Sequence, residues 1–556
     1  MASSGVHSDH FLTRFRAKEV ILVLLVGSVL LNVMLSSRLH ILEADFVGVM
    51  SNNKSVLTNG GKSLGLEKFA QISADTQQSD APLQCARFGG PSEKAAAEMA
   101  YWRKDIPIEN EFRSAYDGKG KYFVYEPDEA GFSNVRMGFE TVVALAKATG
   151  RTLVLSPTMR FAQLEYQHPE GIRSYAYTDF FDISGIPVIS MEEYIKSVAL
   201  NGQLSNNKGE IMFPPYNRTN WDGRLGNCGN PGIGEAVVFF KWLSESSLAI
   251  SWRRDKCIIP FLSNAEQPVA PMHKALQRIL KEDIKVHERI SSYSGNPIPV
   301  NSSMYDRLRE MAADRNQLCE YDQQLQDAKS IYMTGHEHTG SRPLIQFMAY
   351  LFFESWEHDL QMKRFLRDHL RFSDIIQCAA ARIVKGIREI AVHVANGTND
   401  SGGFDTMHVR REDFKGLDTY KDGIVQPHQM VDAQYFVPQR TVYIATDEKD
   451  KSFFEILHQH HTILFLHDFD HLIEGIDPNY YGMIEQLVCA KGDKFVGTYY
   501  STFTGYINRV RGYHAQKART IEARKGFLNS EYMGHDGHYR KATHVSNEVL
   551  IFYLPN

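Results

Sequence analysis

The sequence lacks several features that would mark a well-defined functional class. Its six cysteines include no CxxC pair, so neither a zinc site nor a thioredoxin-type redox motif is supported. A formal net charge of −5 gives no sign of a nucleic-acid partner. With 43% hydrophobic and 23% charged residues, the chain is neither wholly disordered nor a polytopic membrane protein. Any binding site for an anion must therefore be a local feature.

One long hydrophobic run is present, and it lies near the N-terminus at Val20–Leu35. Two serines follow it and extend it toward the ~17–25 residues that a membrane-spanning helix requires. Basic residues precede it at Arg14, Arg16 and Lys18, which favours a cytoplasmic N-terminus. The sequence therefore predicts a single transmembrane signal-anchor at residues 19–37.

This anchor predicts the setting of the rest of the chain. Residues 1–18 would form a cytoplasmic tail, and residues 38–82, which are polar and without periodicity, would form a stem. Everything after the anchor would be lumenal. A cleaved signal peptide is the alternative, but Arg38–Ile41 follows the run without a small-x-small cleavage site. Because a short span suits thin membranes, we expect a type II protein of the Golgi or endoplasmic reticulum membrane.

The cysteines all lie on the predicted lumenal side, where disulfides can form. Cys228, Cys257 and Cys319 occur in loop-like sequence, where pairing is plausible. Cys378 and Cys489 occur in apolar helical patterns, and a buried free thiol is at least an equal alternative for them. Five glycosylation sequons agree mildly with lumenal exposure: Asn53, Asn217, Asn301, Asn396 and Asn399.

A strand, loop, helix and strand unit opens the folded part. Lys121–Tyr125 and Thr152–Leu155 are short apolar runs typical of strands, and between them apolar residues recur at helical spacing up to Gly150. The loop places Gly131 and Asn134 at the helix N-terminus, where backbone N–H groups and the helix dipole favour an anion. The alternative is an ordinary turn in which the asparagine acts as a cap.

A second unit surrounds a basic element about three quarters of the way along the chain. A short mixed run ends in His408, Val409, Arg410 and Arg411, and a parallel sheet delivers such residues to the crevice at its strand ends. The arginine fork matches phosphate or carboxylate. Three further apolar runs predict a second parallel sheet: residues 441–447, 462–466 and 494–498.

The last of these runs leads into Ser501–Gly505, a hydroxyl-rich turn that suits a phosphate at a helix N-terminus. Two α/β units with facing strand-end loops predict a cleft between domains as the ligand site. Helical patterns at residues 344–353 and 365–387 lie between the two units, and we expect the second to lead into the second domain. Residues 166–330 show long loops and give no substrate.

Four blocks, in this order, resemble the GDP-fucose O-fucosyltransferase family. They cover roughly residues 120 to 515, and they are specific together although each is weak alone. The blocks are Gly131–Met137, His408–Phe414, Ile444–Glu448, and Ile484–Ala490 with Ser501–Phe503 and Arg511–Tyr513.

The resemblance implies an α/β fold of two Rossmann-like domains facing a cleft, the GT-B arrangement, with an inverting mechanism and neither a cofactor nor a required metal. Residues 83–387 would form the N-terminal Rossmann-like domain with acceptor-side loops. Residues 388–556 would form the C-terminal Rossmann-like domain that binds the nucleotide sugar, with a C-terminal extension.

Arg410 matches the arginine of the family that contacts the diphosphate and helps it leave. The chemistry supports this independently, because breaking the sugar–phosphate bond builds negative charge that a preorganised guanidinium stabilises most in the transition state. The alternative for Arg410 is a structural ion pair with Glu412 or Asp413. Arg411 has no assigned role beyond holding these acidic residues or the domain interface.

The resemblance also implies a set of residues that bind the donor. His408 would line the nucleotide pocket, Ser501, Thr502 and Phe503 would bind the phosphates and pack near the nucleoside, and Glu485 would hold the base or ribose. The first loop completes the set: Gly131, Phe132 and Asn134.

The first loop departs from the family pattern at the position of the catalytic base. Some members have a glutamate directly before the Gly-Phe-Asn run, but Ala130 stands there in this sequence. Glu129 is the candidate base, with Glu126 and Asp128 as alternatives. A strongly dissociative transition state would need no base from the protein.

Several competing signals favour structural roles. Asp468-Phe469-Asp470 fits a DxD metal motif, but we interpret it as a surface loop. Histidines near His336, His458 and His535 lack HExxH spacing, so no metal site is expected. The basic run from Arg509 to Lys525 predicts a solvated helix face, in which Arg511 is the residue expected to support the site.

Together these patterns predict a metal-independent fucosyltransferase that moves fucose from GDP-fucose to a hydroxyl, most simply a Ser or Thr of a protein. Transfer to a glycan, or from another deoxysugar nucleotide such as a rhamnose donor, is one alternative. A non-catalytic lumenal binding module is another. The expected partners are a nucleotide sugar, a protein or glycan acceptor and a membrane, without nucleic acid.

Overall fold

The computed structural model describes the folded part of the chain, and all of these residues belong to one compact unit, Gly65–Asn556. The predicted anchor and stem lie outside the described residues. No helix within the described part is both long and apolar enough to span a bilayer. The described residues are 83–102, 111–127, 131–159, 161, 164, 174–214, 235–250, 252, 256–264, 269–282, 301–312, 315–334, 351–394, 402–415, 430, 436, 439–499, 501–517, 525, 530–533 and 539–541.

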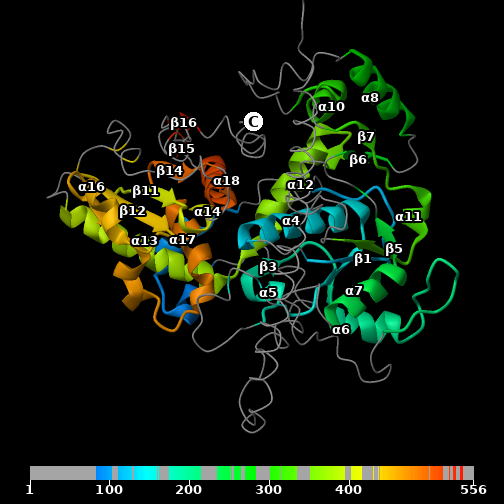
Figure 1. Ribbon diagram of the computed structural model, residues 1–556, viewed down its shortest axis with the longest axis horizontal. Coiled ribbons are helices and arrows are strands. Elements are labelled where there is room, and N and C mark those ends of the chain that lie inside the picture. The colour runs from blue at the N-terminus through cyan, green and yellow to red at the C-terminus, as the bar shows by residue number, and fades with distance from the viewer. Residues whose placement is uncertain are drawn as a thin grey trace, which may run out of the picture. The chain divides into compact units, whose positions relative to one another are not determined.

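The N-terminal sheet has five parallel strands in the order β4-β2-β1-β8-β5 (Figure 1). The predicted strands at the start of this unit are confirmed as β1 and β2. Because all strands run in the same direction, their carboxyl ends share one edge. The strand bounds are Tyr122–Tyr125 (β1), Thr152–Leu155 (β2), Val188–Ser190 (β4), Leu248–Ile250 (β5) and Ser330–Met333 (β8).

Helix α4, Phe132–Thr149, follows β1 and confirms the predicted helix. Its apolar residues at helical spacing, among them Phe139 and Val143, are fully buried. The helix ends at Gly150, whose φ of 69° lies in the left-handed region. A Cβ at this position would also come within 2.8 Å of the Tyr116 carbonyl oxygen, so glycine is required there both for conformation and for space.

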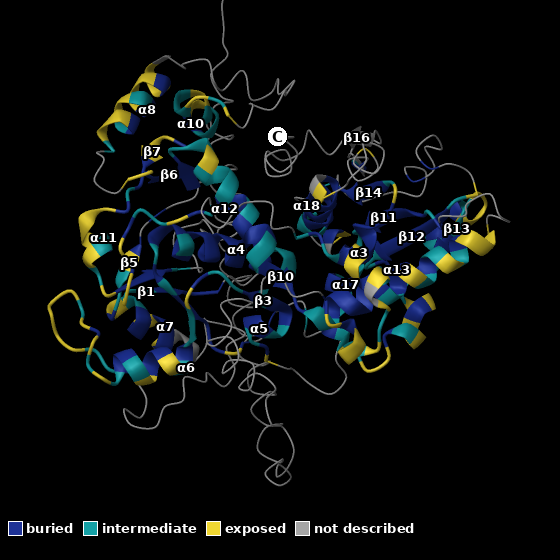
Figure 2. Cartoon of the chain, turned by 180° about the vertical axis from the view of Figure 1, so that it is seen from behind, coloured by how far each residue is buried: buried dark blue, intermediate teal, exposed yellow. Residues whose placement is uncertain are grey.

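The C-terminal sheet has six strands in the order β13-β12-β11-β14-β15-β16, of which only the β15–β16 pair is antiparallel. This confirms the predicted second sheet. Its central strands are buried (Figure 2). The bounds are Asp405–Val409 (β11), Thr441–Thr446 (β12), Thr462–Leu464 (β13), Phe495–Thr498 (β14), Ser530–Met533 (β15) and Tyr539–Lys541 (β16).

The helices of this second unit cover the sheet on its two faces. Helices α13 and α17 pack against β12, while Met407 and Val409 of β11 face a separate apolar cluster that includes residues of α16. The alternation of side chains along β11 therefore places His408 on the face opposite these two residues. The bounds are Asp374–Val394 (α13), Glu412–Lys415 (α14), Glu455–His458 (α16), Tyr481–Cys489 (α17) and Thr502–Lys517 (α18).

The region between the two sheets corrects two sequence predictions. Residues 351–353 belong to strand β9, Leu351–Phe353, rather than to a helix, because these three buried apolar residues pair with β6. The helical pattern at 365–387 is interrupted by β10, Leu370–Phe372, which pairs antiparallel with β3, Phe181–Ile183. Single apolar runs of three residues carry no signal that separates strand from helix.

Further elements lie before, within and after residues 166–330, the region for which the sequence predicted only long loops. The remaining strands are Cys257–Phe261 (β6) and Gln317–Leu318 (β7). The remaining α-helices are Glu93–Met99 (α3), Tyr177–Phe180 (α5), Met191–Tyr194 (α6), Glu235–Glu245 (α7), Ala270–Glu282 (α8), Met304–Ala312 (α10), Gln323–Asp327 (α11) and Trp356–His369 (α12). Short 3-10 and π segments are Cys85–Phe88 (η2), Ile195–Ala199 (η5), Lys451–Phe454 (η8), Leu466–Leu472 (η9) and Pro478–Tyr480 (η10).

Two disulfides cross-link the described part of the chain. Cys257 pairs with Cys319, as their loop-like setting had suggested. Cys378 pairs with Cys85, so the expectation that it is as readily a free thiol is wrong. Its helix α13 packs against η2, which brings Cys85 to it from 293 residues away. Cys489 is a buried free thiol, and Cys228 lies outside the described residues.

Candidate functional site

The candidate site begins where β11, β12 and β14 end side by side. In the sheet register Val409 lies opposite Thr446, and His408 lies opposite Gly497. The residues that follow these strands are therefore neighbours. Arg410 thus comes to lie between the ends of β12 and β14.

Arg410 makes contacts to both of these neighbouring strand ends. Its backbone N–H donates to the Thr498 hydroxyl oxygen at 2.9 Å. Its side-chain Nε lies 3.3 Å from Asp447 Oδ2, and 22% of its side chain remains exposed. The ion pair with Asp447 was not expected, since the sequence pointed to Glu412 or Asp413. The cation is thus held at a strand end and is still reachable by an anion.

Asp447 organises the loop that follows β11. One of its oxygens accepts the Arg411 N–H at 2.7 Å and the other accepts the Glu412 N–H at 3.2 Å. The carboxylate therefore caps the backbone that leads into α14. Asp447 was not among the predicted site residues, although its place directly after β12 was the available signal.

Arg411 is turned toward a different partner from Arg410. Its Nε donates to Glu448 Oε2 at 2.8 Å, and its guanidinium lies 3.8 Å from the centre of the Phe453 ring. Desolvation works against ionisation of Glu448, but hydrogen bonds from the Asp450 N–H, Arg411 and Lys415 prevail and lower its pKa to about 2. Arg411 is therefore a structural residue that holds the β12 end.

His408 is buried within the same site. Its Nδ1 lies 2.6 Å from the Thr504 hydroxyl, and its ring stacks on Phe503 with centroids 4.4 Å apart. Burial, helped by the nearby charge of Arg410, holds the pKa of His408 well below its usual range. The imidazole is therefore neutral, and it contributes shape and hydrogen bonding rather than charge.

Gly497 makes the close approach of α18 to this strand possible. A Cβ at Gly497 would come within 2.2 Å of Thr504 Cγ2. Any side chain there would push α18 away from β14 and separate Thr504 from His408. The glycine thus sets the distance between the sheet and the helix that carries the hydroxyl-rich turn.

The hydroxyl-rich turn lies at the N-terminus of α18, as predicted. Thr502 is the first residue of this 16-residue helix, Ser501 precedes it, and both are half-buried together with Phe503. Free N–H groups and the helix dipole favour an anion at such a place. This part of the site therefore combines hydroxyls, a helix N-terminus and the Arg410 cation.

Glu485 lies on α17 beside the same sheet. The Tyr443 hydroxyl donates to its Oε1 at 3.4 Å. Desolvation raises the pKa of Glu485 to about 8, and repulsion from Asp447 adds to this, while Lys451 and Tyr443 oppose it. The carboxyl is therefore mostly protonated at neutral pH, which the sequence did not reveal.

The first loop contributes fewer described groups. Gly131 is the N-cap of α4, and its carbonyl accepts the Asn134 N–H at 2.8 Å. The Phe132 ring packs edge-on against Phe180 with centroids 4.9 Å apart, in an aromatic cluster rather than toward the C-terminal strand ends. The Asn134 Oδ1 is buried and has no hydrogen-bond partner among the residues that the structure describes. Asp128, Glu129 and Ala130 lie outside them.

Glu126 is the described member of the three candidate bases. It follows β1 directly and is 7% exposed. Its Oε2 accepts the Tyr332 hydroxyl at 2.9 Å and the Thr334 hydroxyl at 3.0 Å. Both donors come from the end of the neighbouring strand β8 or just beyond it. The carboxylate thus ties two strand ends together through one of its oxygens.

The described residues of the competing motifs have mainly structural roles. Asp468 lies in η9 and accepts the Phe465 N–H at 2.8 Å. It therefore acts as a cap and does not lie in an irregular surface loop. Among the residues that the structure describes, no three His, Cys, Asp or Glu side chains form a group able to hold a metal ion. The histidines near His336 and His535 lie outside these residues.

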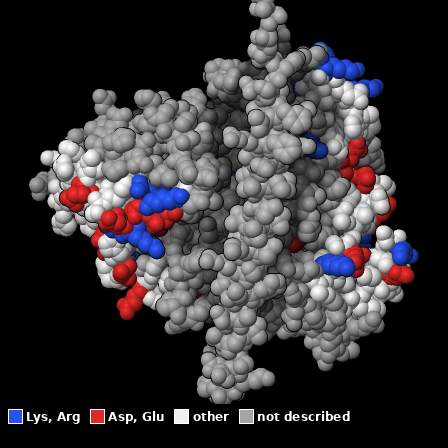
Figure 3. All heavy atoms as spheres, in the orientation of Figure 1, with Lys and Arg blue, Asp and Glu red and all other residues white. Residues whose placement is uncertain are grey.

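The basic run after residue 508 is buried in one part and solvated in another. Arg509 and Arg511 are buried, which corrects the prediction for these two residues, whereas Lys517 and Lys525 are exposed. Arg511 donates to the Ser530 hydroxyl at 2.8 Å and to the backbone carbonyls of Ala490, Gly492 and Asp493, so it fixes a loop and β15. On the face shown in Figure 3, basic and acidic side chains of described residues are mixed, without a broad surface of one sign.

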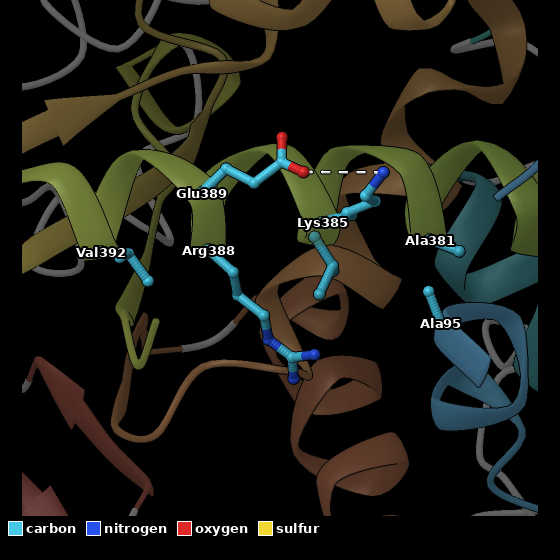
Figure 4. Close-up of a pocket in the computed structure, with 7 residues that line it drawn as sticks. Ala95, Ala381, Lys385, Arg388, Glu389 and Val392 are labelled. Carbon is cyan, nitrogen blue, oxygen red and sulfur yellow. Dashed lines mark ion pairs between the residues drawn. The ribbon is translucent and has the colours of Figure 1, made fainter. Parts of the chain in front are cut away.

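A groove of about 170 Å³ between α3 and α13 lies apart from this set of residues (Figure 4). None of the strand-end residues described above lines it. Its wall is mostly aliphatic, and Lys385 and Glu389 form an ion pair across one helical turn at 3.6 Å. Its two cations, Lys385 and Arg388, are paired with Glu389 and Glu98, and no hydroxyl side chain is among its lining residues. Its lining is Ala95, Ala381, Val384, Lys385, Arg388, Glu389 and Val392.

The chain is similar to known fucosyltransferases. The crystal structure of POFUT1 in complex with GDP is 14% identical, with 71% of this chain and 95% of that chain covered and a TM-score of 0.28. The fucosyltransferase NodZ from Bradyrhizobium is 13% identical, with 70% and 93% covered and a TM-score of 0.29. The comparison with curated proteins gave no match. The family model of GDP-fucose protein O-fucosyltransferase matches residues 122–514. The chain therefore belongs to the GDP-fucose protein O-fucosyltransferase family.

Proposed function

We propose that this protein transfers fucose from GDP-fucose to a hydroxyl group of an acceptor, with inversion and without a metal ion, in a two-domain GT-B arrangement. The acceptor is a serine or threonine of a protein. The observation that carries the proposal is the placement of Arg410 between Asp447 and Thr498, at the strand ends that precede the N-terminus of α18.

The chemistry of the donor matches this placement. The diphosphate of GDP-fucose carries negative charge that grows on the leaving β-phosphate, and Arg410 and the N-terminus of α18 stabilise such charge. Ser501 and Thr502 supply hydroxyl donors to the phosphates. His408, Phe503 and Glu485 line the nucleoside side, and Gly131, Phe132 and Asn134 belong to the first loop. Membership of the GDP-fucose protein O-fucosyltransferase family supports the choice of donor.

Glu129 acts as the base that accepts the proton of the acceptor hydroxyl. It stands one residue before the position used by some family members. The protein is a type II membrane protein of the Golgi or endoplasmic reticulum, with residues 83–556 in the lumen. The apolar run at Val20–Leu35 and its basic flank support this location.

One assay tests the function. The full-length protein is incubated with GDP-fucose or competing nucleotide sugars, with a serine- and threonine-containing peptide library or with free glycans, with and without chelator. Fucose transfer to peptides that survives chelation supports the proposal. Transfer only to glycans would identify a glycan as the acceptor. Transfer only from another deoxysugar nucleotide would identify that nucleotide as the donor. Binding of GDP-fucose without hydrolysis or transfer identifies a binding module.

A further inference from the structure

Gln486 connects two parts of the candidate site that are distant in sequence. Its side chain is on α17 and only 2% of the residue is exposed. The amide nitrogen donates to the Ser133 hydroxyl oxygen at 3.1 Å and to the Phe503 carbonyl oxygen at 3.4 Å. Ser133 lies in the first turn of α4, and Phe503 lies in the first turn of α18. One amide group thus contacts the starts of both helices that carry site loops.

The chemistry of the amide suits this position better than that of any other side chain of similar size. An NH₂ group has two hydrogens and serves two acceptors at once, and both acceptors here are oxygens. An ionised glutamate would offer no donor, and a methionine would fill the space without any hydrogen bond. The position therefore depends on hydrogen-bond donation and not only on volume.

A second connection between α4 and α18 lies deeper in the protein. Glu140 accepts Arg136 Nε at 3.1 Å through one oxygen and Arg509 Nη1 through the other. The Arg136 guanidinium lies 3.9 Å from the centre of the Tyr506 ring. These buried charges are paired and packed, so they hold the bodies of the two helices together without Gln486. Gln486 is left to determine only how their first turns lie relative to each other.

We propose that Gln486 is a positioning residue that holds the first loop, at the start of α4, against the donor-binding turn at the start of α18. The inference rests on the proposed function. Acceptor and donor must be aligned for transfer, and a displacement of about 1 Å can cost on the order of 10²-fold in rate. The groups proposed to bind GDP lie mainly at the C-terminal strand ends and at the start of α18, and the first loop adds Gly131, Phe132 and Asn134. Transfer therefore depends on Gln486 more strongly than binding of GDP does.

The test replaces Gln486 by methionine in the full-length protein. We expect kcat for fucose transfer to the serine and threonine peptide library to fall at least ~10-fold, because alignment is lost. The Kd for GDP and the rate of GDP-fucose hydrolysis stay within about twofold, since neither needs the acceptor side. Gln377→Met is the matched control, because Gln377 is also buried and donates to one backbone carbonyl, that of Phe372, at 3.3 Å. This control keeps the transfer-to-hydrolysis ratio of the natural protein.

Ser133→Ala gives a second route to the same result. It removes one acceptor, so the ratio of transfer to hydrolysis falls, and the double variant Gln486→Met/Ser133→Ala loses less than the product of the two single effects. If Gln486→Met does not fold, Ser133→Ala alone decides. Unchanged transfer in the folded variants, or a Kd for GDP that weakens in proportion to kcat, overturns the inference. A natural protein that neither binds nor hydrolyses GDP-fucose overturns the proposed function instead.

Discussion

The carboxyl ends of β11, β12 and β14 present different chemistry from the carboxyl ends of β1 and β8. The C-terminal strand ends carry the partly exposed cation Arg410, the hydroxyl of Thr498 and the start of α18. The N-terminal strand ends carry the buried carboxylate Glu126, held by two hydroxyls. The strands that carry these ends are parallel to their neighbours in both sheets, so architecture alone does not cause the difference.

The two sets of strand ends therefore suit different kinds of chemical group. Cations and a helix N-terminus suit an anionic diphosphate, whereas a carboxylate suits a group that donates a hydrogen bond or a proton. The residues directly after each strand determine this, because strand ends meet at one edge whatever the side chains are.

Replacing Arg410 by alanine removes the cation from the C-terminal strand ends. We expect kcat for fucose transfer to fall roughly 10²–10³-fold, because a preorganised charge at the leaving group acts mainly in the transition state. Steady-state kinetics with GDP-fucose measures this. Arg388→Ala is the control, since Arg388 is also a half-exposed arginine in an ion pair, with Glu98, and lines the groove between α3 and α13. Full activity in Arg410→Ala would contradict the assignment.

Two isosteric changes separate the candidate bases on the acceptor side. Glu129→Gln removes the proposed base and is expected to lower transfer about 10²-fold or more, while hydrolysis of the donor persists. Glu126→Gln keeps an oxygen that accepts from Tyr332 and Thr334, so transfer should change less than ~3-fold. Rates of transfer and hydrolysis are measured for both variants. The reverse order of effects would make Glu126 the base.

The pKa of Glu485 predicts a pH dependence of GDP affinity. If the ionised carboxylate holds the base or ribose, binding releases the proton that the free protein keeps up to a pKa of about 8. The Kd for GDP should then fall up to ~10-fold per pH unit between pH 6 and 8. Calorimetry in buffers of different ionisation enthalpy measures the released proton. Glu485→Gln reports the titration of GDP itself and should show no protein-derived proton.

Glu485 should also affect stability, in a direction fixed by its raised pKa. Between the ordinary value of 4.5 and about 8, the folded protein holds a proton that the unfolded chain has lost, so stability falls as pH rises through this window. Buried His408 and His514, whose pKa values are lowered, act in the opposite sense. The measure is therefore the difference in thermal midpoint between the natural protein and Glu485→Gln at pH 5 and pH 7. An identical pH trend in both proteins would contradict the shift.

The two disulfides should differ in their effect on stability rather than on chemistry. Cys85–Cys378 spans 293 residues and Cys257–Cys319 spans 62. In the loop-entropy model the longer closure stabilises by about 1 kcal/mol more. Thermal unfolding of the two double-alanine variants should therefore show a lower midpoint for Cys85→Ala/Cys378→Ala. Equal midpoints would show that native packing, and not loop length, dominates.

Much of the site could be anticipated from short local patterns. The strand before Arg410, the turn before α18 and the Gly131 start of α4 were all identified, because apolar runs, glycines and hydroxyls report local conformation directly. Failures occurred where a run was too short to carry a period, as at Leu351–Phe353. They also occurred where a polar residue in a helix turned out to be buried, as with Arg511.

Local patterns in the sequence predicted β1, β2, β11, β12, β13 and β14, together with the family blocks, but they did not predict β4, β5, β8, β15 or β16. The contacts between residues that are distant in sequence became visible only in the tertiary structure. Asp447 faces Arg410 because β12 lies beside β11, Cys85 reaches Cys378 because η2 packs on α13, and Gln486 bridges two helix starts. Such contacts depend on strand order and helix packing. These are determined by the whole chain, so a short segment of the sequence does not reveal them.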